Sequence, residues 1–210
     1  PDTSWELLAV DDGSTDGTDS TLADLQSAMP QLRVLRLERN CGQSAALWMG
    51  FQQARAPWIA TLDADGQNDP ADLPALWAKR DEADAVFGYR ASRQDRWSKR
   101  VGSRMANAIR NRILRENIRD TGCSMKLFQR QLTTRLAPWN GMHRFFGTLF
   151  LMQGARIAQL PVNHRPRAAG QSKYTNLGRL PKTIRDLMAM RWLRDRYVNV
   201  HLREPDADGG

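Results

Sequence analysis

The sequence is short of the residues that would cross-link it or anchor it in a membrane. Its two cysteines, Cys41 and Cys123, are too few for a disulfide framework or for a zinc site built from cysteine, and they favour a reducing, cytosolic compartment. Nothing resembles a signal peptide, and no run reaches the roughly 20 apolar residues that cross a bilayer. The chain is therefore expected to have no membrane anchor of its own.

Acidic residues are scarce in the second part of the chain. Residues 1–89 carry 6 Lys and Arg against 15 Asp and Glu, a net charge of −9, whereas residues 90–210 carry 25 against 8, a net charge of +17. This asymmetry suits a protein that holds a metal ion with one part and an anion with the other. Nucleic-acid binding and a solvated basic surface are the alternatives. The acidic clusters at 11–16 and 63–72 argue against a nucleic-acid partner, because they would repel phosphate without a bridging cation.

The remaining composition is ordinary for a globular protein, since 41% of the 210 residues are hydrophobic and 26% are charged. Apolar runs of strand length alternate with helical patterns, which predicts an α/β fold with a mostly parallel central sheet flanked by helices. Pro161 predicts that the last strand lies at an edge of the sheet. Strands are expected at 5–10, 32–37, 57–62, 84–88, 122–128 and 157–163, and helices at 19–29, 44–54, 72–82, 98–115, 145–152 and 178–200.

The stretch 61–70 joins an apolar strand to a helix for which Asp69 is the expected N-cap. Ligands bind at the carboxyl ends of strands in open α/β sheets, so Asp63, Asp65 and Gln67 are expected to converge there. Such oxygens suit a hard divalent cation that also holds a diphosphate. For Asp-x-Asp taken alone, an acidic turn that only caps a helix is the stronger interpretation, since short motifs often match by chance.

Several motifs in a fixed order carry a more specific signal. Asp-Asp-Gly-Ser-Thr-Asp-Gly-Thr at 11–18, Asn-x-Gly at 40–42 and Asp-Ala-Asp-Gly-Gln-x-Asp-Pro at 63–70 resemble family 2 glycosyltransferases of the GT-A fold. The stretches 121–128, 141–145 and 164–174 extend the likeness to the dolichol- or polyprenyl-phosphate hexose synthases, the dolichol-phosphate mannosyltransferase type. The resemblance covers roughly residues 5–195.

The resemblance implies the organisation of the chain. The family begins with a strand that has no counterpart before residue 5, so the first strand and part of the nucleotide-base pocket are expected to be missing. A GT-A domain is expected at 1–176, a C-terminal amphipathic helix at 177–200 and a polar tail at 201–210.

The resemblance also implies an activity and its residues. The reaction would be inverting transfer of a hexose from GDP-mannose or a UDP-hexose to a polyprenyl or dolichyl phosphate, with Mg²⁺ or Mn²⁺ as cofactor. The metal ligands would be Asp63, Asp65 and Gln67, and the catalytic residues Asp65 and Asp120. The nucleotide sugar would be held by Asp11, Asp12, Asp63, Ala64, Arg90, Arg165 and Lys173, and the acceptor phosphate by Lys99, Ser103 and Ser172.

Alternatives remain for several of these residues. An acceptor phosphate has a second pKa of about 6 and is mostly ionised at neutral pH, so a general base is not required, and Asp120 is equally well read as a turn-forming residue. Lys99 is equally well read as part of a solvated helix face. His143 and His164 are too far apart in sequence to suggest a site.

The expected helix at 178–200 bears on location. Its apolar residues are expected on one side with a cationic rim, which suits an anionic membrane surface at the inner face of the membrane in the cytoplasm. Packing on the sheet or pairing with another subunit is the alternative. The apolar set comprises Leu180, Ile184, Leu187, Met188, Trp192 and Leu193. A transferase acting on a glycan hydroxyl, which would need a base, and a non-catalytic nucleotide-sugar-binding fragment are the competing functions.

Overall fold

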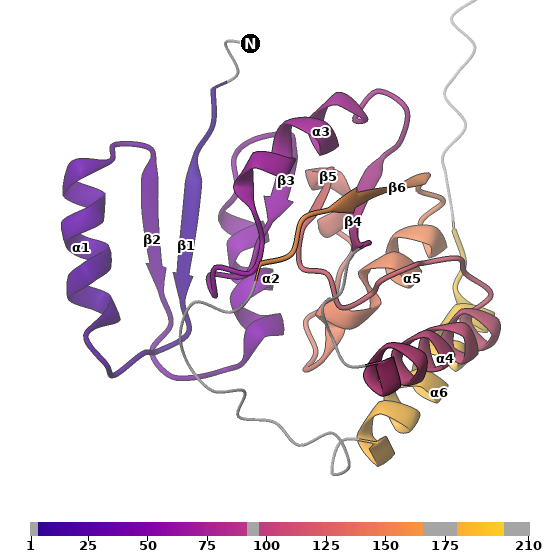
Figure 1. The fold of residues 1–210 in the computed structure, drawn as a ribbon. Coiled ribbons are helices and arrows are strands. Elements are labelled where there is room, and N and C mark those ends of the chain that lie inside the picture. Colours follow the sequence, from indigo (N-terminus) through magenta and orange to yellow (C-terminus); the bar gives the residue numbers. More distant parts are fainter. Residues whose placement is uncertain (1–3, 92–96, 166–179, 200–210) are drawn as a thin grey trace, which may run out of the picture.

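The computed structural model describes residues 4–91, 97–165 and 180–199, in which strands and helices alternate (Figure 1). The strands are β1 (Leu7–Asp11), β2 (Leu32–Arg36), β3 (Trp58–Thr61), β4 (Ala85–Arg90), β5 (Lys126–Gln129) and β6 (Ile157–Val162). The helices are α1 (Thr18–Ala28), α2 (Gln43–Gln53), α3 (Leu73–Ala78), α4 (Trp97–Leu114), α5 (Phe146–Met152) and α6 (Leu180–Arg196). Short 3-10 turns lie at η1 (Pro70–Asp72), η2 (Arg130–Thr133) and η3 (Met142–Phe145). The expected α/β class is confirmed.

The sheet is divided into two parts within the described residues. β1 and β2 form a parallel pair, and the other four strands form a sheet in the order β3-β5-β4-β6. Figure 1 places β1 on the side of its pair that is nearer to β3. The two parts of the sheet are divided between β1 and β3. The sequence analysis expected the first strand of the family's sheet to be missing. β6 is an edge strand, as Pro161 predicted.

The expected parallel pairing holds for β1 with β2 and for β4 with β6, but β5 runs antiparallel to both β3 and β4. The return path of the chain explains the reversal. Asp120 is hydrogen-bonded to Arg90 at the carboxyl end of β4, so the segment that leads into β5 enters the sheet at that end. Alternating strand and helix patterns cannot reveal this, because they do not indicate the end at which a strand begins.

Helices cover both faces of the four-stranded sheet. Side chains along a strand alternate between the faces, so the apolar residues of β5 need cover on both sides. In β5, Phe128 points to the side of α2 and α5, where its ring contacts Phe51 and Phe150. Leu127 points to the opposite side and packs with Leu76 of α3. The hydrophobic clusters on the two faces of the sheet therefore both include residues of β5.

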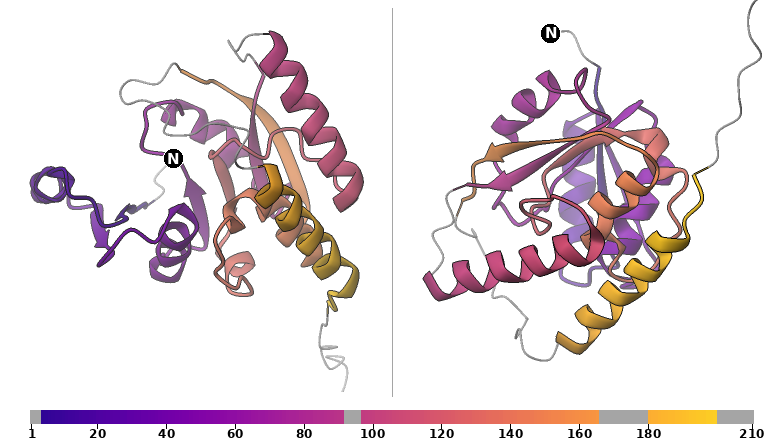
Figure 2. Two further views of the ribbon diagram at one scale, coloured as in Figure 1. Left: turned by 90° about the horizontal axis from the view of Figure 1, so that it is seen from below. Right: turned by 90° about the vertical axis from the view of Figure 1, so that its right-hand side faces the viewer.

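α4 and α6 lie side by side, as both views in Figure 2 show. Met190 of α6, only 3% exposed, packs with Leu114 of α4 and with Phe145. The single apolar side expected for this helix is corrected, because Leu187 packs inward with this cluster whereas Met188 is 55% exposed. Within the part of the chain that the structure describes, none of the helices combines the length and the hydrophobicity needed to cross a bilayer.

Candidate active site

The loop after β3 is fixed by Ser124, which lies two residues before the start of β5. The Ser124 hydroxyl accepts hydrogen bonds from the Asp63 amide at 3.3 Å and from the Asn68 side-chain amide at 2.7 Å. The Ser124 carbonyl accepts from the Thr61 hydroxyl at 2.7 Å. Both ends of the loop are thus tied to one residue, which holds its acidic side chains at the carboxyl end of β3.

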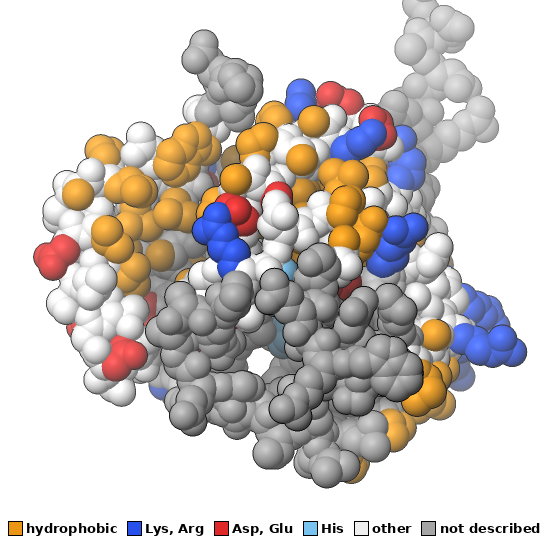
Figure 3. Space-filling model, viewed as in Figure 1, with side chains coloured by type: hydrophobic (Ala, Val, Ile, Leu, Met, Phe, Trp, Pro, Cys, Tyr) orange, Lys and Arg blue, Asp and Glu red, His pale blue; other side chains and the backbone are white. Residues whose placement is uncertain are grey.

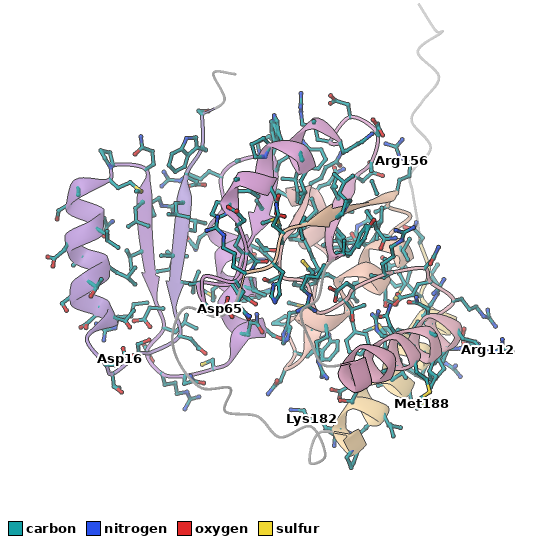
Figure 4. The ribbon with its side chains drawn as sticks, viewed as in Figure 1. Asp16, Asp65, Arg112, Arg156, Lys182 and Met188 are labelled. Atoms are coloured by element: carbon teal, nitrogen blue, oxygen red, sulfur yellow. The ribbon has the colours of Figure 1, made fainter. Side chains whose placement is uncertain are left out.

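Asp63 and Asp65 occupy this loop and are accessible. Asp63 is exposed, and its Oδ1 accepts a hydrogen bond from the Gln43 amide of α2 at 2.8 Å. Asp65 is half-buried, and its Oδ1 accepts from the backbone N–H of Gln67 at 3.1 Å. Figure 4 shows Asp65 near the middle of the molecule, beside the carboxyl ends of the strands. Ala64 lies between the two acids and is exposed.

A second segment, from the far end of the chain, runs beside the same loop. His164 forms an isolated antiparallel bridge with Asn68, and its Nε2 lies 3.4 Å from the Gln67 side-chain nitrogen. The Arg165 amide donates to the Gln67 carbonyl at 2.9 Å, and the Arg165 guanidinium pairs with Asp69. Arg165, expected to contact the nucleotide sugar, is held by the loop that carries the acids.

The donor set fits a hard divalent cation. Within the described ranges, no three His, Cys, Asp or Glu side chains gather into a cluster able to hold a metal ion. Two carboxylates and an amide oxygen in one loop are nevertheless sufficient for Mg²⁺ or Mn²⁺, because such ions take one or two carboxylates and complete their shell with phosphate oxygens and water. Asp63, Asp65 and Gln67 are the side chains that would hold it.

A cavity of about 140 Å³ opens beside Asp63, between β5, the start of α2 and η3. His143 lines it, and its Nδ1 lies 2.8 Å from the hydroxyl of Ser44, a residue that is only 4% exposed. The same hydroxyl accepts the Gly141 backbone N–H at 3.0 Å. Burial, and then the positive charges of Arg144 and Lys126, lowers the pKa of His143 from 6.5 to about 4.

Lys126 also lines this cavity. It is the first residue of β5, is 5% exposed and points to the same face as Phe128. Its ammonium donates to the Cys123 carbonyl and lies 5.5 Å from the centre of the Phe87 ring. Burial lowers the pKa of Lys126, and Cys123, Asp120 and Asp63 oppose this change.

Asp11 and Asp12, expected to hold the nucleoside, are engaged in turn contacts. Asp12 accepts the N–H groups of Cys41 and Gly42 at 2.7 and 2.8 Å, which fixes the chain just before α2. Asp11 is 5% exposed, and its Oδ1 accepts the Ser14 N–H at 2.9 Å. Asp12 thereby positions the start of α2. Gln43 at this start donates a hydrogen bond to Asp63.

Arg90 and Asp120 were expected to have separate roles, and they are bonded to each other. The Arg90 guanidinium donates to Asp120 Oδ2 at 2.7 Å and to Oδ1 at 2.9 Å, with the two side chains 15% and 14% exposed. Asp120 also accepts the Gly122 N–H at 3.1 Å. Because both carboxylate oxygens are engaged, this geometry favours a positioning role for Asp120 over that of a general base.

The other expected site residues are not placed. Lys99 and Ser103 belong to α4, but their side chains are outside the described part, and Ser172 and Lys173 lie outside the described residues altogether. Conversely, Gln43, Ser44, Lys126 and His143 were not among the expected site residues. Lys126 and His143 nevertheless belong to the stretches 121–128 and 141–145 that carried the family resemblance, and Lys126 is a charged residue at the start of a short strand.

Comparison with known proteins identifies the family of this chain. The family model described as "Glycosyl transferase family 2" matches residues 1–136. A dodecaprenyl-phosphate galacturonate synthase of Rhizobium johnstonii is 35% identical over 195 residues, which is 89% of this chain and 56% of that protein. The chain thus spans little more than half the length of this relative.

Solved structures share the fold. Glucosyl-3-phosphoglycerate synthase from Mycobacterium tuberculosis, in a complex with Mn²⁺, UDP and glucosyl-3-phosphoglycerate, gives a TM-score of 0.60 at 20% identity and covers 90% of this chain and 68% of its own. A mannosyltransferase from Pyrobaculum calidifontis, in a complex with GDP-Man and Mn²⁺, gives a TM-score of 0.60 at 18% identity, with 93% and 56% covered. Both have the GT-A fold, as this chain does. The family match extends over more than half of the residues, and the chain belongs to glycosyl transferase family 2.

Proposed function

We propose that this chain transfers a hexose, or the corresponding uronic acid, from a nucleotide diphosphate sugar to a polyprenyl phosphate, with inversion at the anomeric carbon. The observation that carries the proposal is the position of Asp63, at the mouth of a cavity whose inner wall holds Lys126 and His143. The galacturonate synthase of Rhizobium johnstonii, which is named for a polyprenyl-phosphate product, supports the acceptor class. Whether the donor is GDP-mannose, a UDP-hexose or a UDP-hexuronate is to be decided by assay.

The metal role rests on the loop after β3. The chemistry that Mg²⁺ or Mn²⁺ would supply here is Lewis acidity toward the leaving nucleotide diphosphate. Asp63, Asp65 and Gln67 would hold the ion, and the contacts of Ser124 with both ends of the loop would keep these side chains preorganised.

The acceptor class is supported by the lack of a suitable base. Among the described residues that line the cavity, Asp63 is the only carboxylate, and it belongs to the proposed metal set. His143 has a pKa lowered to about 4, which makes it a weak base at neutral pH. A sugar hydroxyl would need a base, whereas a phosphate monoester with a second pKa of about 6 is already ionised. The geometry therefore favours a phosphate acceptor over a glycan hydroxyl.

We also propose that α4 and α6 face an anionic membrane surface at the inner, cytoplasmic side. Apolar side chains are exposed along both helices: Met105 and Ile109 on α4, and Ile184, Met188 and Trp192 on α6. Figure 3 shows Lys and Arg side chains beside hydrophobic ones on this side of the molecule, and Figure 4 labels Arg112, Lys182 and Met188 there. Apolar and cationic groups together are what an interfacial helix presents to anionic lipid.

A direct link joins this surface to the cavity. Asp186 of α6 pairs with Arg144 at 2.5 Å, and Arg144 lines the cavity next to His143. A lipid phosphate held at the surface near α6 would therefore lie close to the wall of the site. This contact supports an acceptor that arrives from the membrane.

The test is a transfer assay with purified full-length protein. Radiolabelled GDP-mannose, UDP-glucose and UDP-galacturonate are each incubated with a short-chain polyprenyl phosphate, with Mn²⁺, with Mg²⁺ or with EDTA. The proposal predicts a metal-dependent, alkali-stable lipid product with at least one donor. Binding of the donor without any product would support the non-catalytic alternative.

A further inference from the structure

Lys126 and His143 line the cavity without a metal or nucleotide role, and Ser44, which lies outside the lining, is hydrogen-bonded to His143. Ser44 and Lys126 are 4% and 5% exposed, so both are almost completely removed from solvent. Burying a hydroxyl and an ammonium costs free energy unless partners compensate. The hydrogen bonds of these groups therefore indicate what the cavity is built to hold.

The bonds of Ser44 determine the tautomer of His143. The Gly141 N–H can only donate, so the Ser44 hydroxyl accepts from it and retains its own proton to donate. Donation to His143 Nδ1, 2.8 Å away, satisfies that proton, whereas an Nδ1–H tautomer would leave the buried hydroxyl proton without an acceptor. His143 is therefore neutral with its proton on Nε2, and no hydrogen bond joins Nε2 to any other residue in the described part. The imidazole presents an N–H donor.

Lys126 presents further donors to the same cavity. An ammonium has three N–H groups, and within the described residues the one hydrogen bond of this ammonium goes to the Cys123 carbonyl. The Phe87 ring, 5.5 Å away, and the carboxylates of Asp120 and Asp63 offset only part of the cost of burial, because the pKa of Lys126 remains lowered. A nearly buried cation with donors left over is stabilised by an anion.

We propose that this cavity binds an anionic oxygen group of a substrate through the Nε2–H of His143 and the ammonium of Lys126, with Ser44 as the positioning residue that fixes the histidine tautomer. This inference rests on the proposed transfer function. Two substrate groups share the required chemistry, namely a carboxylate on the transferred sugar and the phosphate of the acceptor. Asp63 at the cavity mouth would then face the diphosphate through the metal, while the interior takes the second anion.

A purely structural role for these residues is the competing explanation. It predicts that Lys126→Met and His143→Gln change stability without changing which substrates bind. It also gives no reason for Nε2 to face a cavity rather than a protein acceptor. Lys79→Met is the matched control, because Lys79 is on the surface, where it pairs with Glu82, and lies outside the lining of the cavity.

The decisive experiment compares three ligands by calorimetric titration in the presence of Mn²⁺: UDP-glucose, UDP-glucuronate and farnesyl phosphate. Loss of a charge-assisted hydrogen bond weakens binding by about 10- to 100-fold. If the sugar carboxylate is the ligand, Lys126→Met and His143→Gln weaken the binding of UDP-glucuronate by that factor, and the affinity for UDP-glucose stays within about twofold. If the acceptor phosphate is the ligand, the same variants weaken the binding of farnesyl phosphate instead. Unchanged affinity for all three ligands in folded variants overturns the proposal.

A measurement on the unaltered protein does not depend on how the variants fold. Long-range ¹H–¹⁵N correlation NMR of ¹⁵N-histidine-labelled protein at pH 7.5 should show Nδ1 unprotonated and Nε2 protonated for His143, and Ser44→Ala should shift its ¹⁵N resonances toward the tautomer mixture of a free neutral histidine. An Nδ1–H signal in the unaltered protein contradicts the inference. Binding of these ligands without turnover would refute the transferase function and leave this inference intact. Normal turnover by Lys126→Met and His143→Gln would refute this inference and leave the transferase function intact.

Discussion

Protonation of His143 should destabilise the fold, and the structure gives the size of the effect. The ring is half-buried, is hydrogen-bonded to Ser44 through Nδ1 and lies near the cations Arg144 and Lys126. Partial burial and these charges lower its pKa to about 4 from 6.5. At pH 7.5 neither the folded nor the unfolded chain holds this proton. As the pH falls below about 6.5, the unfolded chain takes it up and the folded chain does not, so the free energy of unfolding decreases until the pH reaches about 4.

The expected loss is large enough to measure. With these pKa values the linkage relation gives about 2 kcal/mol at pH 5 and about 3 kcal/mol when the transition is complete. Urea unfolding, followed by tryptophan fluorescence at pH 7.5, 6.0 and 5.0, supplies the free energies. His143→Gln keeps an acceptor for the Ser44 hydroxyl but cannot be protonated, so its decrease from pH 7.5 to 5.0 should be smaller by about 2 kcal/mol.

The control is Lys79→Gln, an exposed substitution outside the cavity, which should retain the pH dependence of the unaltered protein. Other groups titrate in the same range, and they cancel in the difference between each variant and the unaltered chain. If His143→Gln loses stability in parallel with the unaltered protein, the neutral state of His143 in the folded chain is refuted.

Three further predictions concern other parts of the molecule. Asp12→Ala should lower the free energy of unfolding by about 2 kcal/mol, because two backbone N–H groups lose a charged acceptor. In urea unfolding the exposed Asp24→Ala should change it by less than about 0.5 kcal/mol, and equal effects would refute the role of Asp12. Asp65→Ala should reduce Mn²⁺-dependent transfer by at least about 100-fold with an unchanged melting temperature, and near-normal turnover would remove the residue from the metal set. Trp192→Asp should weaken sedimentation with phosphatidylglycerol vesicles by about tenfold, whereas Trp5→Asp, equally exposed at 59%, should not; equal or absent effects would contradict the membrane-facing surface.

The order of strands and helices was predictable from the sequence because it depends on local patterns. Apolar runs and helical periodicity extend over neighbouring residues, and the N-cap at Asp69 is visible as Asp-Pro, with its side chain accepting the Ala71 N–H at 3.1 Å. The position of Asp63 and Asp65 in a strand-to-helix turn followed for the same reason. The acids and the loop were therefore identified before any contact was known.

Contacts between distant residues were not predictable in this way. The pairing of Arg90 with Asp120 joins residues 30 positions apart, and it accounts for both the reversed direction of β5 and the engaged carboxylate of Asp120. The bond between Ser44 and His143 spans 99 positions. Neither leaves a local pattern, since a serine near a helix start and an isolated histidine are common in any sequence.

The two sides of α6 illustrate a different limit. Leu187 and Met188 are adjacent apolar residues of one helix, and hydrophobicity alone does not say which faces the protein. Packing with Leu114 and Phe145 brings Leu187 and Met190 inward and leaves Met188 outside. Both interpretations of this helix, packing and surface exposure, therefore apply to different sides of it.

The most direct test of the account is a single transfer reaction. The protein is incubated with a panel of labelled GDP- and UDP-sugars, polyprenyl phosphate and Mn²⁺, and the lipid fraction is counted for the unaltered chain and for Asp65→Ala. The account predicts label in the lipid fraction with at least one donor, lost on chelation and lost in the variant. Label that survives both chelation and Asp65→Ala, or none with any donor despite tight nucleotide-sugar binding, would contradict it.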